Sequence, residues 1–126
     1  MADSVSGRCK CGQLSYQGKR SDVPTFRCYC RDCQQLTGTG HTEMVPMQAA
    51  GFQISGELRE FEMAGGSGQS TFSGFCPNCG SQILRRSVRS GDRLYVHDAS
   101  LDDPTVYQPE NLIYTDSAQP WDQPEL

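Results

Sequence analysis

Residues 76–80 read Cys-Pro-Asn-Cys-Gly, and this stretch predicts more about the fold than any other part of the sequence. Two cysteines separated by two residues and followed by glycine are typical of a zinc knuckle. In such a knuckle a tight turn brings both thiolates onto one ion, and the glycine accepts a positive φ angle. A structural zinc ion has four protein ligands. Cys76 and Cys79 therefore predict half of a site.

The other half is predicted near the N-terminus, where Cys9 and Cys11 lie two residues apart. Residues at this spacing on an extended chain point to the same side, so both sulfurs can reach one ion. Such an ion would join two distant segments and close a long loop of the unfolded chain. We expect a structural zinc site on Cys9, Cys11, Cys76 and Cys79. A different pairing of ligands and free thiols are the alternatives.

A second group of cysteines, Cys28, Cys30 and Cys33, has spacings of two and three. Sulfurs at these spacings can converge where a strand runs into a helical turn. Three protein ligands leave the fourth position of a zinc ion open, and an open zinc can hold an external thiol as thiolate near neutral pH. We predict that these three cysteines bind a catalytic zinc that acts on a thiol substrate.

The spacing alone leaves two other interpretations of the second group open. Cys30 and Cys33 could instead form a redox pair. A histidine, either His41 or His97, could also complete a second structural metal site. Isolated histidines in a β domain are more often packed or exposed side chains than ligands, so we do not include them among the expected ligands.

The number of cysteines also favours metal binding. There are seven, an odd number that cannot pair completely in disulfides. The N-terminus lacks the apolar stretch of a secretory signal, and no run approaches the ~20 apolar residues of a membrane span. We therefore expect a cytoplasmic protein without a membrane partner. In that compartment thiols stay reduced, and clustered cysteines are usually metal ligands or catalysts.

The charge of the chain argues against a nucleic-acid partner. The formal net charge is -4, whereas affinity for DNA or RNA comes mainly from cationic side chains that neutralise phosphates. Arg85, Arg86, Arg89 and Arg93 could form a local basic patch. A solvated strand and turn is the simpler interpretation of these arginines.

The pattern of the whole chain predicts a mainly β fold with little helix. Short segments of alternating apolar and polar residues are separated by turns, most of which contain glycine. The expected strands are 13–17, 26–30, 41–47, 52–55, 57–63, 70–75, 82–86 and 93–97. Residues 32–36 are the one expected helix, and residues 64–68 are expected at the tip of a hairpin. At 126 residues, one domain is the default.

Three motifs carry a resemblance to a known family: Gly-Arg-Cys-Lys-Cys-Gly-Gln-Leu-Ser-Tyr at 7–16, Cys-Tyr-Cys-Arg-Asp-Cys-Gln-Gln-Leu-Thr-Gly at 28–38, and Phe-Cys-Pro-Asn-Cys-Gly at 75–80. With these motifs in order, the sequence resembles the glutathione-dependent formaldehyde-activating (centromere protein V-like) family. Leu-Asp-Asp-Pro at 101–104 and the late Trp121 add to the resemblance. Its extent implies a single domain over residues 1–126, with a core at about 7–104 and a C-terminal extension at 105–126.

The resemblance implies a zinc-bound β-tent made of short antiparallel sheets. It also implies the ligand division given above, with one structural zinc on four cysteines and one catalytic zinc on three. The implied activity is formation of S-(hydroxymethyl)glutathione from glutathione and formaldehyde. This reaction is grouped with carbon–sulfur lyases because its reverse cleaves that bond. Family members usually carry histidine between the first two catalytic cysteines, where this chain has Tyr29, and this difference bears on which thiol or aldehyde is the substrate.

Glutathione carries two carboxylates, so its binding site should offer cationic side chains. Arg31, Arg27 and Lys10 are the basic residues nearest in sequence to the cysteine motifs, and we expect them to be candidates for this contact.

Two other classes of function compete with a zinc enzyme. A non-enzymatic zinc module that binds a protein partner is one, because related β-tent folds include guanine-nucleotide exchange factors. The other is a thiol redox enzyme similar to methionine sulfoxide reductases of the B type, which would need metal-free Cys30 and Cys33. The extra three-cysteine group favours the enzyme over the binding module.

Overall fold

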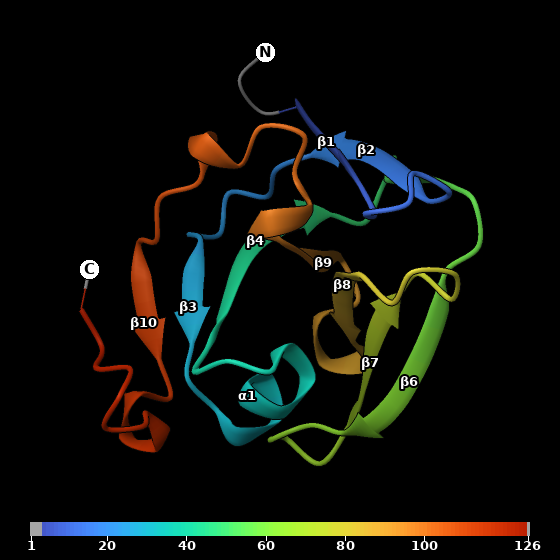
Figure 1. The fold of residues 1–126 in the computed structure, drawn as a ribbon. Coiled ribbons are helices and arrows are strands. Elements are labelled where there is room, and N and C mark those ends of the chain that lie inside the picture. The colour runs from blue at the N-terminus through green and yellow to red at the C-terminus, as the bar shows by residue number, and fades with distance from the viewer. Residues whose placement is uncertain (1–3, 126) are drawn as a thin grey trace.

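The structure is a computed structural model that describes residues 4–125 and contains two β-sheets (Figure 1). The smaller sheet has the order β1-β2-β5, and the larger has the order β10-β3-β4-β9-β8-β7-β6. The strands are β1 Ser4–Arg8, β2 Ser15–Lys19, β3 Phe26–Cys28, β4 Thr42–Gln48, β5 Gln53–Ser55, β6 Arg59–Ala64, β7 Ser70–Phe75, β8 Gln82–Ser87, β9 Arg93–His97 and β10 Asn111–Ile113. The prediction of a mainly β fold is confirmed.

The helices are short. They are α1 Arg31–Thr37 and the 3-10 helices η1 Val88–Ser90, η2 Asp98–Ser100, η3 Pro104–Val106 and η4 Thr115–Ser117. Within residues 4–125, no helix has the length and apolar character that crossing a membrane would require. The ends of the expected domain, residues 1–3 and 126, lie outside the described residues.

Several expected elements differ from the observed ones for local reasons. The strand expected at 13–17 begins only at Ser15, because the backbone N–H of Cys9 donates to the carbonyl of Leu14 at 3.0 Å and holds residues 9–14 in a turn. The strand expected at 26–30 ends at Cys28, because Cys30 is already the N-cap of α1. The strands at 70–75 and 93–97 and the hairpin tip after Ala64 are confirmed.

The buried core lies between the two sheets. One face of the large sheet contributes Val45, Met47, Leu84 and Val96, and the small sheet contributes Tyr16. The Tyr16 ring stacks on Phe52 with 5.5 Å between centroids. Burial of these apolar side chains is the main stabilising term available to the fold.

The opposite face of the large sheet holds the residues that build the site. In the ladders Cys28 lies opposite Thr42, Met44 opposite His97, and Arg85 opposite Tyr95. Opposed residues of an antiparallel pair share a face, and so do alternate residues of one strand. In Figure 1 the large sheet curves around α1. Residues of this face and of the helix line one cavity together.

Candidate metal centres and the adjoining cavity

The structure brings Cys9, Cys11, Cys76 and Cys79 together, as the sequence predicts. All four sulfurs lie within 4.8 Å of one another, with 3.6 Å between the sulfurs of Cys9 and Cys11 and 3.8 Å between those of Cys11 and Cys76. Four thiolates at such distances suit the tetrahedral coordination of zinc. This four-cysteine group could therefore hold a metal ion.

Two tight turns create the four-cysteine group. In the second turn the N–H of Gly80 donates to the carbonyl of Cys76 at 2.8 Å, and Gly80 has φ 80°, which a residue without a Cβ adopts at no steric cost. The N–H of Lys10 in the first turn donates to the Ser81 hydroxyl at 2.9 Å and joins the two turns. Hydrogen bonding, led by the Ser81 hydroxyl, lowers the pKa of Cys79 to about 5. The geometry thus favours the thiolate form of Cys79, one of the four that a metal site requires, whereas burial raises the pKa of Cys76 to about 11.

The structure also brings Cys28, Cys30 and Cys33 together. Their sulfurs lie within 4.8 Å of one another, and those of Cys30 and Cys33 are 3.1 Å apart. Cys28 is the last residue of β3, and the sulfur of Cys30 caps α1 by accepting from the N–H of Cys33 at 3.3 Å. This is the strand-to-helix arrangement that the spacing predicts. The three-cysteine group could likewise hold a metal ion, with one coordination position left over.

Charge is shared unevenly in the three-cysteine group. Hydrogen bonds from the thiols of Cys28 and Cys30, together with the positive charge of Arg85, lower the pKa of Cys33 to about 2. Hydrogen bonding to Cys30 and Cys33, together with burial, raises the pKa of the Cys28 thiol. Nη1 of Arg85 donates directly to the sulfur of Cys33 at 3.1 Å. A thiolate at Cys33 is therefore paired with a cation.

A cavity of about 520 Å³ opens over the three-cysteine group. All three cysteines line it, together with apolar side chains such as Phe26 and Met44. The charged lining residues are Arg31, Arg85, Arg89, Arg93 and Asp32. Among the described residues, Arg31, Arg85 and Arg89 have no carboxylate within 4.0 Å, the limit for an ion pair. The cavity thus carries uncompensated positive charge beside a cluster of sulfurs.

Of the three basic residues expected to contact glutathione, one lines the cavity and two lie elsewhere. Arg31 lines the cavity, but Arg27 donates to Glu43 at 2.9 Å on the other side of β3, and Lys10 borders a separate cavity beside Cys9. Arg85, Arg89 and Arg93 also line this cavity, whereas the sequence alone indicates a basic patch and gives no connection with the three-cysteine group. The alternation of β8 was the available signal, because it separates Arg85 from Arg86. Arg86 bonds Glu60 through two nitrogens and stacks on Phe72 instead.

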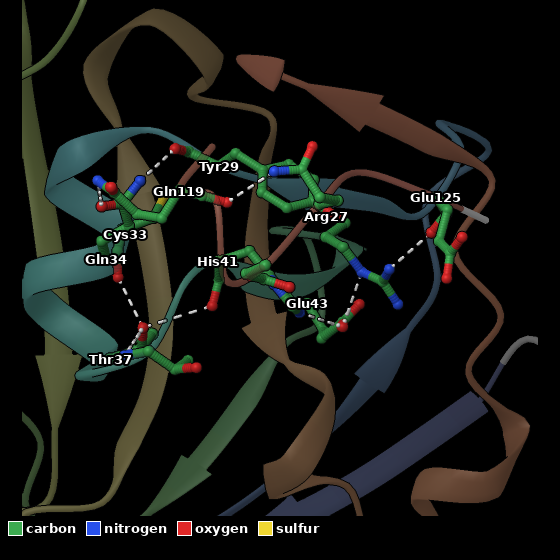
Figure 2. A network of polar contacts seen from close by, with 12 residues as sticks. Arg27, Tyr29, Cys33, Gln34, Thr37, His41, Glu43, Gln119 and Glu125 are labelled. Carbon is green, nitrogen blue, oxygen red and sulfur yellow. Dashed lines mark hydrogen bonds and ion pairs between the residues drawn. The ribbon is translucent and has the colours of Figure 1, made fainter. Parts of the chain in front are cut away.

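A network of polar side chains links α1 to the C-terminal segment after β10 (Figure 2). The buried Gln34 donates to the carbonyl of Tyr29 at 2.8 Å and to that of Ser117 at 2.9 Å, and it accepts from Gln119 at 3.0 Å. The ring of Tyr29 is fully buried. Its centroid is 5.1 Å from that of His41. The C-terminal segment after β10 is thus fastened to the helix that carries Cys33.

Neither histidine joins a metal-capable group in residues 4–125. His41 lies between two carboxylates, with Nδ1 at 2.5 Å from Asp122 and Nε2 at 2.9 Å from Glu43. Figure 2 shows His41 beside Glu43. His97 is buried on β9, where desolvation and the nearby Arg85 lower its pKa to about 4. His97 is therefore neutral at physiological pH.

Comparison with known proteins gives a consistent result. The family model described as glutathione-dependent formaldehyde-activating enzyme matches residues 4–117. A crystal structure of a Rhodobacter sphaeroides protein, a structural genomics target, superposes with a TM-score of 0.67 at 16% identity and covers 86% of this chain and 99% of its own. That likeness concerns the fold alone. No curated protein matches in sequence. Because the family model spans nearly the whole sequence, the chain belongs to the glutathione-dependent formaldehyde-activating enzyme family.

Proposed function

We propose that this protein is a zinc-dependent enzyme that joins a small thiol to an aldehyde and also catalyses the reverse cleavage, as a carbon–sulfur lyase does. The specific reaction is formation of S-(hydroxymethyl)glutathione from glutathione and formaldehyde. One observation carries the proposal: the three-cysteine group lies in the wall of a cavity of about 520 Å³ that also contains four arginines. Family membership supports glutathione and formaldehyde as the substrates.

The two cysteine groups have different tasks in this proposal. Cys9, Cys11, Cys76 and Cys79 hold a structural zinc with a complete set of ligands. Cys28, Cys30 and Cys33 hold a catalytic zinc and leave room for the substrate sulfur. Zinc bound there would supply the Lewis acidity that keeps the substrate thiol deprotonated near neutral pH.

The cavity supplies binding and orientation. Its volume of about 520 Å³ lies within the usual range for small-molecule sites, roughly 300–1,000 Å³. Arg31, Arg89 and Arg93 offer donors for the two carboxylates of glutathione, and Asp32 can accept from its ammonium group. Fixing the carboxylates in this way directs the thiol toward the three cysteines. Holding thiol and aldehyde together lowers the entropic cost of their reaction.

Two broader assignments belong to the same proposal. We place the enzyme in the cytoplasm, where thiols are kept reduced. We also treat residues 1–126 as one domain, since β10 from the expected C-terminal extension pairs with β3 in the large sheet.

The test is exchange NMR of glutathione and formaldehyde with their adduct, comparing the wild type with Cys30→Ser at equal occupancy of the structural zinc site. We expect the wild type to accelerate the exchange and the variant to return to the uncatalysed rate. Exchange rates equal to the uncatalysed rate for both proteins would show that glutathione and formaldehyde are not the substrates.

A thiol redox enzyme is the second candidate, because the sulfurs of Cys30 and Cys33 are only 3.1 Å apart. A redox role requires that the two thiols be free of metal and cycle through a disulfide. Catalytic turnover of an oxidised substrate with a dithiol reductant, in protein whose three-cysteine group is metal-free, would favour this candidate. A module that only binds a protein partner has less support, because it does not need an arginine-lined cavity beside its cysteines.

A further inference from the structure

Arg85 occupies a special place in the cavity. It lies on β8 opposite Tyr95, on the face of the sheet that carries Cys28 and Thr42. Its side chain lines the cavity, and Nη1 donates to the sulfur of Cys33 at 3.1 Å. One nitrogen of the guanidinium group thus contacts the three-cysteine group directly.

The other donors of Arg85 have no acceptor. Nε and Nη2 are buried and make no hydrogen bond within residues 4–125, and no described carboxylate pairs with this side chain. In contrast, Arg27 and Arg86 both bond carboxylates. A buried donor without an acceptor is costly, and nearly all buried donors in native proteins have a partner, so an unpartnered one facing a cavity calls for a functional explanation. These donors therefore indicate a place for an acceptor inside the cavity.

The proposed reaction creates such an acceptor close to sulfur. When a thiolate adds to an aldehyde, the C–S bond forms and the π pair of the carbonyl moves onto oxygen. The oxygen becomes an alkoxide separated from the sulfur by one carbon. The donors of a guanidinium group are fixed in one plane, so a group with one nitrogen against a cluster sulfur presents its neighbouring N–H groups beside that position.

We propose that Arg85 is a catalytic residue that donates from Nε or Nη2 to the developing alkoxide. This inference rests on the proposed function. The alkoxide then takes a proton from water, which replaces the proton that the glutathione thiol released to solvent on forming the thiolate, and Arg85 stays protonated throughout. In the reverse direction the same donors stabilise the alkoxide while the C–S bond breaks and the electron pair returns to sulfur. A fixed donor of this kind contributes most when it is aimed at charge that appears only in the transition state.

A different role for Arg85 would give a different experimental result. If Arg85 only neutralised the sulfur cluster or held a carboxylate of the substrate, its loss would weaken metal or glutathione binding and leave the rate at saturation unchanged. A catalytic contact predicts the opposite result: the rate at saturation falls, while the binding of metal and glutathione is unchanged. The reason is that the alkoxide is absent from the bound thiol.

The experiment compares wild type with Arg85→Lys, Arg85→Ala and a control, Arg86→Ala, which alters the neighbouring arginine on the other face of β8. Cobalt-substituted protein is titrated with glutathione alone, and the thiolate-to-cobalt absorption band gives the affinity without turnover. Exchange NMR at saturating glutathione and formaldehyde gives the rate. Guanidinium chloride at low concentration is then added to Arg85→Ala to restore the missing group.

We expect Arg85→Lys to lower the enzyme-dependent exchange rate about 100-fold, or to background, with little change in the cobalt titration. Arg86→Ala should match the wild type in both measurements, and guanidinium should restore part of the rate to Arg85→Ala. An unchanged saturated rate in the Arg85 variants, or a loss explained wholly by weaker titration, would overturn the catalytic role and leave the proposed function standing. A wild type without acceleration would overturn both.

Discussion

The two cysteine groups differ in what surrounds them. The four-cysteine group sits between two turns that are closed by backbone hydrogen bonds, and its sulfurs supply every ligand that a zinc ion needs. The three-cysteine group lacks one ligand and faces a cavity with four arginines. Both contain thiols at close range, but all three cysteines of the second group line its cavity, whereas Cys9 is the one member of the four-cysteine group that lines the cavity beside it. In the proposed function, the surroundings of each cysteine group, more than its number of sulfurs, are the reason for assigning a structural role to the first and a catalytic role to the second.

The two groups are also supported differently. Backbone turns hold the four-cysteine group, and metal would complete it by joining the N-terminal hairpin to the β7–β8 turn. The three-cysteine group is held by the cap of α1 and by the side-chain network of Gln34 and the C-terminal segment. Loss of metal from the four-cysteine group should consequently unfold the domain, whereas loss of metal from the three-cysteine group should leave the fold nearly intact.

The largest effect should come from Cys76→Ser. Cys76 is fully buried in the core cluster as well as part of the four-cysteine group. Structural zinc in small domains contributes about 10 kcal/mol or more, which is comparable with the whole stability of a domain, about 5–15 kcal/mol. We expect the variant to show no cooperative transition in a thermal melt followed by circular dichroism. A soluble variant that melts cooperatively near the wild-type temperature would contradict the structural role.

Cys30→Ser should have a much smaller effect on stability. Serine is a favoured N-cap, so the cap of α1 survives the substitution, and the half-buried sulfur leaves no large void. We expect a folded protein that binds one zinc per chain where the wild type binds two, measured by native mass spectrometry. Mild chelation of the wild type should remove the same ion first. Loss of both ions, or of neither, would show that the groups are not independent.

Much of this organisation could be predicted from the sequence because it is local. The spacings of the cysteines define both groups, and alternation defines β7 and β9. In contrast, β1 and β10 were missed. β1 has the sequence Ser-Val-Ser-Gly-Arg, in which only one residue is strongly apolar, and β10 has three residues and a parallel partner far away in sequence. Such strands are specified by their neighbours in the sheet.

The cavity could not be predicted, because its lining comes from many strands. Arg85, Arg89 and Arg93 lie far from the three-cysteine group in sequence, and only the ladders from β3 to β8 bring them beside it. The buried position of His97 and the pairing of His41 with two carboxylates also depend on long-range contacts. Nearness in sequence therefore predicts Arg31 correctly, but it also favours Arg27 and Lys10, which lie outside this cavity.

Arg89→Ala tests whether the positive charge of the cavity beside the three-cysteine group binds glutathione. Arg89 is exposed on η1 at the edge of the cavity and has no carboxylate partner among the described residues. We expect glutathione affinity to fall about tenfold, equivalent to about 1.4 kcal/mol, with weaker dependence on salt and no change in thermal stability. Calorimetric titration with glutathione at two salt concentrations measures the affinity and its salt dependence. Arg59→Ala is the matched control, because Arg59 is an exposed arginine on β6 outside the cavity. Equal losses in both variants would indicate a general charge effect.

The most local effect should come from His41→Gln, which tests the side-chain support of the three-cysteine group. The histidine contacts Asp122 and Glu43, and both contacts are partly shielded from solvent, so their loss should cost about 1–2 kcal/mol. The cost should be local: amide exchange should accelerate in the C-terminal segment at 115–125 and in α1, while residues 9–14 and 76–81 keep their protection. Asp116→Asn, an exposed change on η4, is the control. Faster amide exchange around the four-cysteine group as well would mean that the His41 contacts stabilise both regions. Contacts that act only locally would leave exchange at the distant four-cysteine group unchanged.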